Sequence, residues 1–165
     1  MCPRSPRSVR VLPHVWNLRS RRALDPIGTA IRFAARRFDL RLCEFSVQGN
    51  HIHLIVEAAG QVALSRGMKG LGVRLARGLN KMMNGRRGRV LADRYHAHVL
   101  RTPTEVRRAV HYVRHNHRKH ALDRGDSMSP TWVDPYSSAC PEHGIPLPAP
   151  RTWLLGHCRA HEAPS

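Results

Sequence analysis

The amino-acid sequence predicts an α+β fold with the element order β-α-β-β-α-β, followed by one further, tyrosine-bearing helix. Two observations carry this prediction. Alternation of apolar and polar residues marks short strands, and apolar residues spaced three and four apart mark helices. This order is that of ferredoxin-like folds, in which an antiparallel sheet carries its helices on one face. The other face of the sheet should then be free.

The first half of the chain is expected to supply a strand, a helix and a hairpin. Residues 1–8 should be disordered, and residues 9–18 should form a first strand bent by Pro13. Asp25 is an N-cap residue followed by Pro26 at the first helical position, which predicts the start of the first helix. Alternation then predicts two strands joined by a turn: residues 43–47 and 51–57, with the turn at 48–50.

The second half is expected to add a helix, a strand and the tyrosine-bearing helix. Residues 61–83 carry an apolar stripe, with glycines that weaken the helix by about 1 kcal/mol each unless they allow close packing on the sheet. A fourth strand is predicted within residues 90–100. The capping box at 102–105 starts the last helix, which should run to about His120. A proline-rich, extended tail, residues 123–165, should follow, with two candidate docking anchors: Trp132 and Trp153.

The charge balance points to a polyanionic partner. Lys and Arg together number 28 against 11 acidic residues, which gives a net charge of +17. Such a surplus favours nucleic acid, because phosphate neutralisation releases counterions. No stretch approaches the ~20 apolar residues that a membrane span needs. The sequence offers no secretion signal and its four cysteines are widely spaced, so we expect reduced thiols and a cytoplasmic protein.

A histidine pair marks the third predicted strand. In His51-Ile52-His53 the two imidazoles flank an apolar residue, so both should point away from the core, on the same face as Ile55 and Glu57. Two imidazoles side by side on an exposed strand face can bind one metal ion. In so basic a chain, a metal at this place suggests phosphate chemistry on nucleic acid.

The last predicted helix supplies the second half of a candidate site. Tyr112 and Asn116 are four residues apart and share one helix face. A tyrosine hydroxyl can attack a phosphodiester and become covalently linked to it. The oxygen of Asn116 could join two imidazoles as a third ligand of Mg²⁺ or Mn²⁺, with imidazoles suiting Mn²⁺ better. The other histidines of this helix should be solvated or face phosphate: His111, His115, His117 and His120.

These residues resemble the single-tyrosine transposases of the HUH type. His51-Ile52-His53 resembles their histidine–hydrophobic–histidine motif, and residues 112–116 resemble their tyrosine helix. Residues 93–101 are similar to the segment that precedes it. The pattern is most similar to REP-associated tyrosine transposases, in which an asparagine commonly follows the tyrosine by four. The chain departs from many relatives at His117, where they carry proline.

The resemblance implies that residues 9–122 form a catalytic domain acting on single-stranded DNA near an imperfect hairpin. Tyr112 would attack a phosphodiester, form a 5′-phosphotyrosine link and free a 3′-OH. The metal, Mg²⁺ or Mn²⁺, would be held by His51, His53 and Asn116, and the protein would act as a monomer or homodimer. The cations expected around the DNA are Arg36, Arg37, Arg86, Arg87, Arg89, Arg114, Arg118 and Lys119.

Several alternatives stay open. His96 and His98 repeat the spacing of the histidine pair, and Tyr95 is a rival nucleophile. In function, the chain could be a catalytically inactive or domesticated nucleic-acid-binding module, although such sheets usually stack bases on aromatic residues. It could also be an HUH replication initiator or relaxase-type nickase, which are usually longer proteins. A structural zinc could be held in the tail by Cys140, His143, Cys158 and His161.

Overall fold

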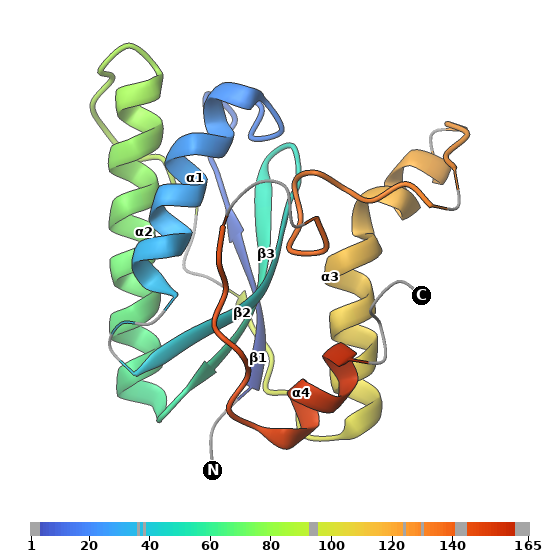
Figure 1. Ribbon diagram of the computed structural model, residues 1–165. Coiled ribbons are helices and arrows are strands. Elements are labelled where there is room, and N and C mark those ends of the chain that lie inside the picture. The colour runs from blue at the N-terminus through green and yellow to red at the C-terminus, as the bar shows by residue number, and fades with distance from the viewer. Residues whose placement is uncertain are drawn as a thin grey trace.

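The computed structural model describes residues 4–35, 37, 39–92, 96–123, 125–129, 131–140 and 145–160. Its elements follow the predicted order and add one short helix at the end (Figure 1). In chain order they are β1 (Arg4–Arg10), α1 (Arg21–Ala34), β2 (Leu40–Val47), β3 (His51–Ala58), α2 (Gln61–Met82), β4 (His96–Ala97), α3 (Pro103–Asp123) and α4 (Trp153–Ala160).

The four strands form one sheet in the order β2-β3-β1-β4, and every neighbouring pair is antiparallel. The α+β class is therefore confirmed. The complete ferredoxin-like topology stays a prediction, because β4 has only two residues.

Two predicted boundaries in the first half of the chain are wrong. β1 occupies Arg4–Arg10, so it begins within residues 1–8, where disorder was expected, and residues 13–15 turn instead of continuing the strand. Pairing with β3 and β4 on its two sides compensates for the poor apolar alternation of this segment. The first helix begins earlier than predicted, because Ser20 caps it by accepting from the amide of Ala23. Pro26 consequently lies inside α1.

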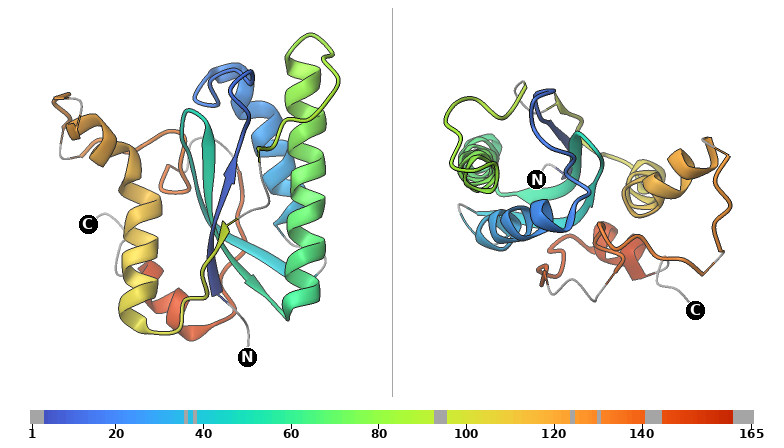
Figure 2. Two further views of the ribbon diagram at one scale, coloured as in Figure 1. Left: turned by 180° about the vertical axis from the view of Figure 1, so that it is seen from behind. Right: turned by 90° about the horizontal axis from the view of Figure 1, so that it is seen from above.

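The sheet carries helices on both faces (Figures 1 and 2). Ile52, Leu54 and Val56 of β3 point into the main core with α1 and α2, as the alternation predicted. Ile55 points the other way and joins a second, smaller core with α3 and α4. The face expected to be free is thus partly covered, because the apolar stripe of α3 needs a partner.

Glycines in α2 permit close approach, as expected. A Cβ on Gly67 would lie 2.7 Å from Cβ of Leu40, so α2 can pack this tightly on β2 only without a side chain there. A Cβ on Gly78 would lie 2.8 Å from Cβ of Pro26, so this glycine makes room for the ring of α1's internal proline.

The segment after α3 is not a loose tail. Of the two predicted anchors, Trp132 does contact another element, because its ring centroid lies 5.5 Å from that of His117 on α3. Trp153 is 76% exposed and stacks on the ring of His157, while Trp132 is also exposed. Residues 136–138 instead pair with the edge strand β2: Val47 donates to the carbonyl of Tyr136, and Ser138 donates to the carbonyl of Phe45. This pairing protects an otherwise open sheet edge.

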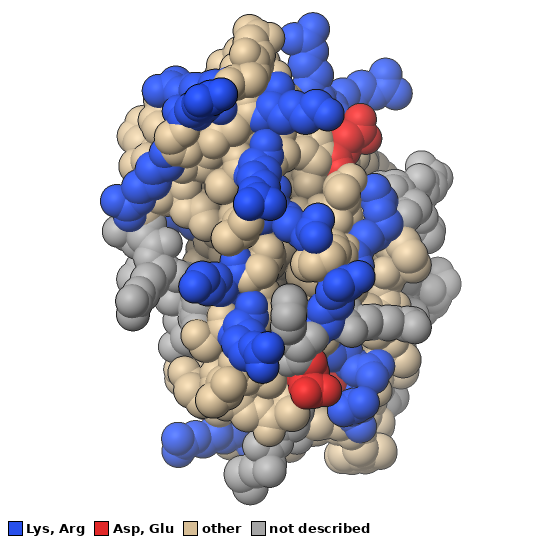
Figure 3. All heavy atoms as spheres, turned by 90° about the vertical axis from the view of Figure 1, so that its left-hand side faces the viewer, with Lys and Arg blue, Asp and Glu red and all other residues tan. Residues whose placement is uncertain are grey.

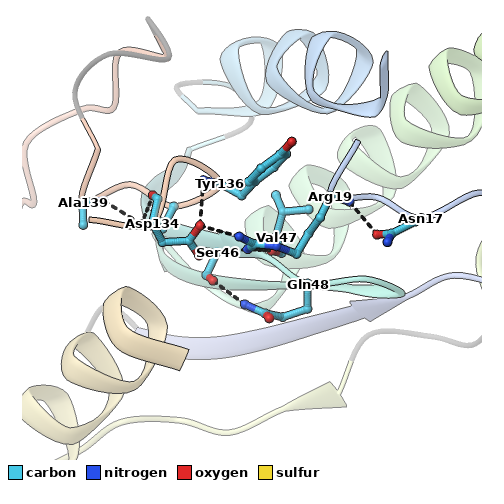
Figure 4. A network of polar contacts seen from close by, with 9 residues as sticks. Asn17, Arg19, Ser46, Val47, Gln48, Asp134, Tyr136 and Ala139 are labelled. Atoms are coloured by element: carbon cyan, nitrogen blue, oxygen red, sulfur yellow. Dashed lines mark hydrogen bonds and ion pairs between the residues drawn. The ribbon is translucent and has the colours of Figure 1, made fainter. Parts of the chain in front are cut away.

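Polar side chains fasten the same segment. Arg19 makes a bidentate ion pair with the buried Asp134, at 2.8 and 2.9 Å, and also donates to the carbonyl of Val47 (Figure 4). Glu57, buried on β3, accepts from the amides of Arg151 and Thr152 just before α4. Buried charges need such partners, so the chain after α3 completes the fold. Among the described residues, no helix has the length and apolar character needed to cross a bilayer.

Candidate active site

Three side chains predicted from the sequence meet between β3 and α3. The ring centroids of His51 and His53 lie 4.6 Å apart, and the hydroxyl of Tyr112 lies 3.4 Å from Nε2 of His53. The two-residue period of β3 places both histidines on one face. α3 covers that face because Val106, Val110 and Val113 pack against Ile55 and Cys43: this apolar contact brings the tyrosine to the histidines. Tyr112 itself remains 44% exposed.

Asn116 lies one helical turn after Tyr112 and is only 2% exposed. Neither its Oδ1 nor its Nδ2 has a hydrogen-bond partner among the described residues. An unsatisfied buried amide costs about 1–3 kcal/mol, so native proteins rarely keep one without a reason. Here the amide lies on the same helix face as Tyr112, where an oxygen ligand for a metal was predicted.

The surroundings of the histidine pair favour the neutral form of both rings. Burial, together with the nearby His51 and His120, lowers the pKa of His53 to about 4. Burial, His120 and Arg10 also lower the pKa of His51. A neutral imidazole is the form that binds metals. Nδ1 of His51 lies 2.7 Å from Oδ1 of Asn50, and because that oxygen only accepts, Nε2 of His51 keeps its lone pair.

His120 also influences the histidine pair, although we expected this residue to be solvated or to face phosphate. It follows Asn116 by four residues and Tyr112 by eight, and its charge acts on both His51 and His53. The same four-residue spacing that linked Tyr112 to Asn116 could have identified it.

The donor set fits a hard divalent ion. Among the described residues, no group of three or more His, Cys, Asp or Glu side chains could hold a metal. A site here would therefore use two neutral imidazoles and the unsatisfied amide of Asn116. Such a set leaves coordination positions open for phosphate and water.

Arg114 does not have the exposed position expected of a DNA contact. Its side chain is 9% exposed, and its guanidinium pairs with the fully buried Glu44 of β2 at 3.0 Å. Ser138 donates a short hydrogen bond to the same carboxylate. This three-way contact joins α3, β2 and the segment after α3, two residues away from Tyr112.

The remaining predicted cations divide between the two sides of the sheet. Arg118 and Lys119 lie on α3, near the histidine side. Arg37 follows α1, and the loop after α2 carries three more, so the structure does not bring these four to the site. Arg36 lies outside the described residues. The loop cations are Arg86, Arg87 and Arg89, all exposed.

The structure describes only some of the residues that the sequence offered as an alternative nucleophile, histidine pair or zinc site. Tyr95 and the side chain of His96 lie outside the described part of the chain. His98 is exposed, with Nε2 3.8 Å from a carboxylate oxygen of Glu105 at the start of α3. Cys140, Cys158 and Cys43 are buried and form no disulfide among the described residues. The rest of the zinc alternative, and one further cysteine, lie outside the described residues: His143, His161 and Cys2.

A comparison with known protein families shows which family the chain belongs to. A family model described as "Transposase IS200 like" matches residues 15–116, from before α1 to Asn116. The chain belongs to the IS200-like transposase family. Membership supports a DNA-cleaving enzyme with a role in transposition, and the matched range contains His51, His53 and Tyr112.

Two solved structures share the fold of this transposase. One is a REP-associated tyrosine transposase bound to a REP hairpin, with a TM-score of 0.62 and 17% identity over 82% of this chain and 76% of the other. The second is a putative transposase from Deinococcus radiodurans R1, with a TM-score of 0.50 and 14% identity over 78% of this chain and 94% of the other. A comparison with curated proteins finds no match.

Proposed function

We propose that this transposase cleaves and rejoins single-stranded DNA through a covalent link to Tyr112, with Mg²⁺ or Mn²⁺ as cofactor. The observation that carries the proposal is the placement of the Tyr112 hydroxyl 3.4 Å from Nε2 of His53, beside a second histidine. The unsatisfied amide of Asn116 on the same helix face supports it. A structural tyrosine would more often be buried with its hydroxyl paired, whereas this one is exposed.

In the proposed step, the Tyr112 oxygen attacks the scissile phosphorus and the bond from phosphorus to the 3′ oxygen breaks. Tyr112 loses its hydroxyl proton and keeps the 5′ phosphate, while the departing 3′ oxygen takes up a proton. The reverse step, with another 3′-OH, rejoins the strand. One phosphodiester bond replaces another at each step, so ATP is not needed.

His51, His53 and Asn116 would hold the divalent ion. When bound, the ion would polarise the scissile phosphate, which helps because a tyrosine hydroxyl with its ordinary pKa of about 10 is a weak nucleophile at neutral pH. Asn50 would orient His51 through the hydrogen bond to Nδ1. The low pKa of His53 keeps that ring available for the metal at neutral pH.

The proposed substrate is single-stranded DNA carrying an imperfect hairpin. The net charge of +17 favours a nucleic acid, and the similar REP-associated transposase was solved with a REP hairpin. We extend that substrate class to this chain, which would act as a monomer or homodimer.

The test is a covalent-adduct assay with labelled single-stranded hairpin DNA from the gene's own flanks. With Mn²⁺, the wild-type protein should give a slowly migrating band on a denaturing gel, and a chelator should abolish it. Tyr112→Phe should lose the adduct and still bind the hairpin, since one oxygen is removed from an exposed ring. Tyr95→Phe is the matched control and should keep the adduct. If the two variants behave the other way round, Tyr95 is the nucleophile.

A further inference from the structure

One exposed arginine of β1 is distinguished from the other cations by its place in the sheet. Figure 3 shows Lys and Arg side chains spread over the height of the α2 side, with little acidic surface between them. Positive charge alone therefore does not identify a functional residue. Arg10, the last residue of β1, is not among the cations that we expected around the DNA, yet strand pairing places it beside the histidine pair.

Arg10 shares a sheet face with the two histidines. Val9 and Val11, its neighbours in sequence, are both buried in the main core with α1 and α2. Since side chains alternate along a strand, Arg10 points to the opposite face, which carries His51 and His53. Its side chain is exposed there.

The register of β1 on β3 sets Arg10 directly opposite His51. The carbonyl of His51 accepts from the amide of Gln48, and the carbonyl of Arg10 accepts from the amide of Ala92, so each residue directs its backbone groups away from the other. This is the non-hydrogen-bonded type of antiparallel pair, in which Cα atoms lie about 4.5 Å apart and side chains approach most closely. Arg10 accordingly contributes, after burial and His120, to the lowered pKa of His51.

No acidic side chain among the residues that the structure describes forms an ion pair with Arg10. The carboxylates of the neighbouring strands have other partners: Glu44 pairs with Arg114, and Glu57 accepts from backbone amides just before α4. An exposed guanidinium beside the candidate metal ligands is therefore available to a substrate anion. Its planar fork of donors matches the oxygens of a phosphate.

We propose that Arg10 is a further catalytic residue, whose guanidinium binds a non-bridging oxygen of the phosphate that Tyr112 attacks. The inference rests on the proposed function and adds a residue to it. Attack by the Tyr112 oxygen increases the negative charge on the oxygens around phosphorus until the bond to the 3′ oxygen breaks. A cation fixed at those oxygens stabilises this transition state more than the bound substrate. Arg10 neither transfers a proton nor forms a covalent bond in the step.

The first test measures how fast the covalent adduct forms in a single turnover, at saturating hairpin DNA and with Mn²⁺. Arg10→Ala should slow this step by about 10²–10³-fold, the usual effect of removing one group that stabilises charge in a transition state. Arg10→Lys should recover part of the rate, because it restores the charge without the planar fork. The matched control is Arg107→Ala, which removes the same charge from an exposed position of α3 and should keep the wild-type rate.

A binding measurement separates the contact from tyrosine chemistry. The DNA carries a neutral methylphosphonate at the position where the wild-type protein cleaves, and a chelator is present so that no metal contributes. Tyr112→Phe should bind this hairpin more weakly than the ordinary one. Adding Arg10→Ala should remove the difference, because the cation that contacts the phosphate is gone. Calorimetry should show that Arg10→Ala still binds Mn²⁺, since a positive charge beside His51 does not assist a metal ion.

Each other outcome overturns the proposal. An unchanged rate in Arg10→Ala, while the wild type forms the adduct, would remove Arg10 from the reaction and leave the proposed function intact. A wild-type protein that forms no adduct would overturn the proposed function, and this inference with it. Equal slowing in Arg107→Ala would show a general effect of charge, and a defect that excess DNA corrects would limit Arg10 to holding the strand. Loss of Mn²⁺ binding in Arg10→Ala would show that the residue acts on the metal site, and a methylphosphonate difference that persists without Arg10 would assign the contact to another residue.

Discussion

Asn116 is the residue whose surroundings most directly suggest a ligand. Its amide is buried on the site face of α3 and makes no hydrogen bond within the described structure. A buried polar group without a partner destabilises a fold, so a bound metal ion would compensate for a cost that the metal-free protein bears.

Asn116→Leu tests this assignment. Because the amide is unsatisfied, its replacement by an apolar group of similar size should leave the metal-free protein as stable as the wild type, or more stable by about 1 kcal/mol. The increase in melting temperature that Mn²⁺ gives the wild type should disappear. The exposed His98→Ala is the control and should keep the Mn²⁺ effect. A variant that melts lower without metal, yet responds normally to Mn²⁺, would give Asn116 a structural role only.

The histidine pair also predicts a pH dependence of stability. In the folded, metal-free protein the pKa of His53 is about 4, below the ordinary value of 6.5 that it takes on unfolding. The unfolded chain therefore binds more protons between these values, and the free energy of unfolding should fall as the pH falls from about 6.5 to about 4. Urea unfolding at several pH values measures this, and His53→Gln should flatten the curve in that window. An identical curve for the variant would mean that His53 titrates normally.

At the scale of elements, the placement of α3 determines whether a site forms. Apolar contacts hold its first half on Ile55 and Cys43, and the ion pair of Arg114 with Glu44 holds the turn that carries Tyr112. Ser138 completes the partners of Glu44 from the segment after α3.

Arg114→Met should therefore destabilise the protein by about 3–5 kcal/mol, because it leaves the fully buried Glu44 carboxylate without its counter-charge. Removing the charge as well, in Arg114→Met/Glu44→Gln, should recover most of that loss. Chemical denaturation of the three proteins gives the comparison. If the single substitution costs less than about 1 kcal/mol, the contact is a weak surface pair and does not fix α3.

The sequence predicted α2 and α3 well because their signals are local. The predicted helix 61–83 is observed as Gln61–Met82, and the capping box forms as expected: Glu105 accepts from the amide of Thr102 and donates its own amide to the Thr102 hydroxyl. The first strand was predicted too late in the chain, at residues 9–18, because strand pairing, and not its own apolar pattern, holds Arg4–Arg10 in the sheet. Long-range pairing leaves no local signal in the chain.

At the scale of the whole molecule, the site too was predictable where its signals are local in the sequence, and not where it depends on contacts between distant segments. The two-residue period of β3 and the four-residue spacing on α3 gave the face of each functional side chain. They could not show that α3 crosses the histidine face, nor that His120 acts on both imidazoles. The chain after α3 was predicted to be extended because of its prolines. Its polar side chains instead meet buried charges far away in sequence, as Asp134 meets Arg19.

The central claim is that Tyr112 is the nucleophile of a metal-dependent DNA strand transferase, and its most direct test is to map the covalent link. The adduct formed with Mn²⁺ is digested with protease and nuclease, and mass spectrometry locates the modified residue. We expect a 5′-linked nucleotide on the peptide that contains Tyr112, and a released strand whose 3′-OH a polymerase can extend. A nucleotide on Tyr95 or on a residue other than tyrosine, or a released strand ending in a 3′ phosphate, would contradict the claim.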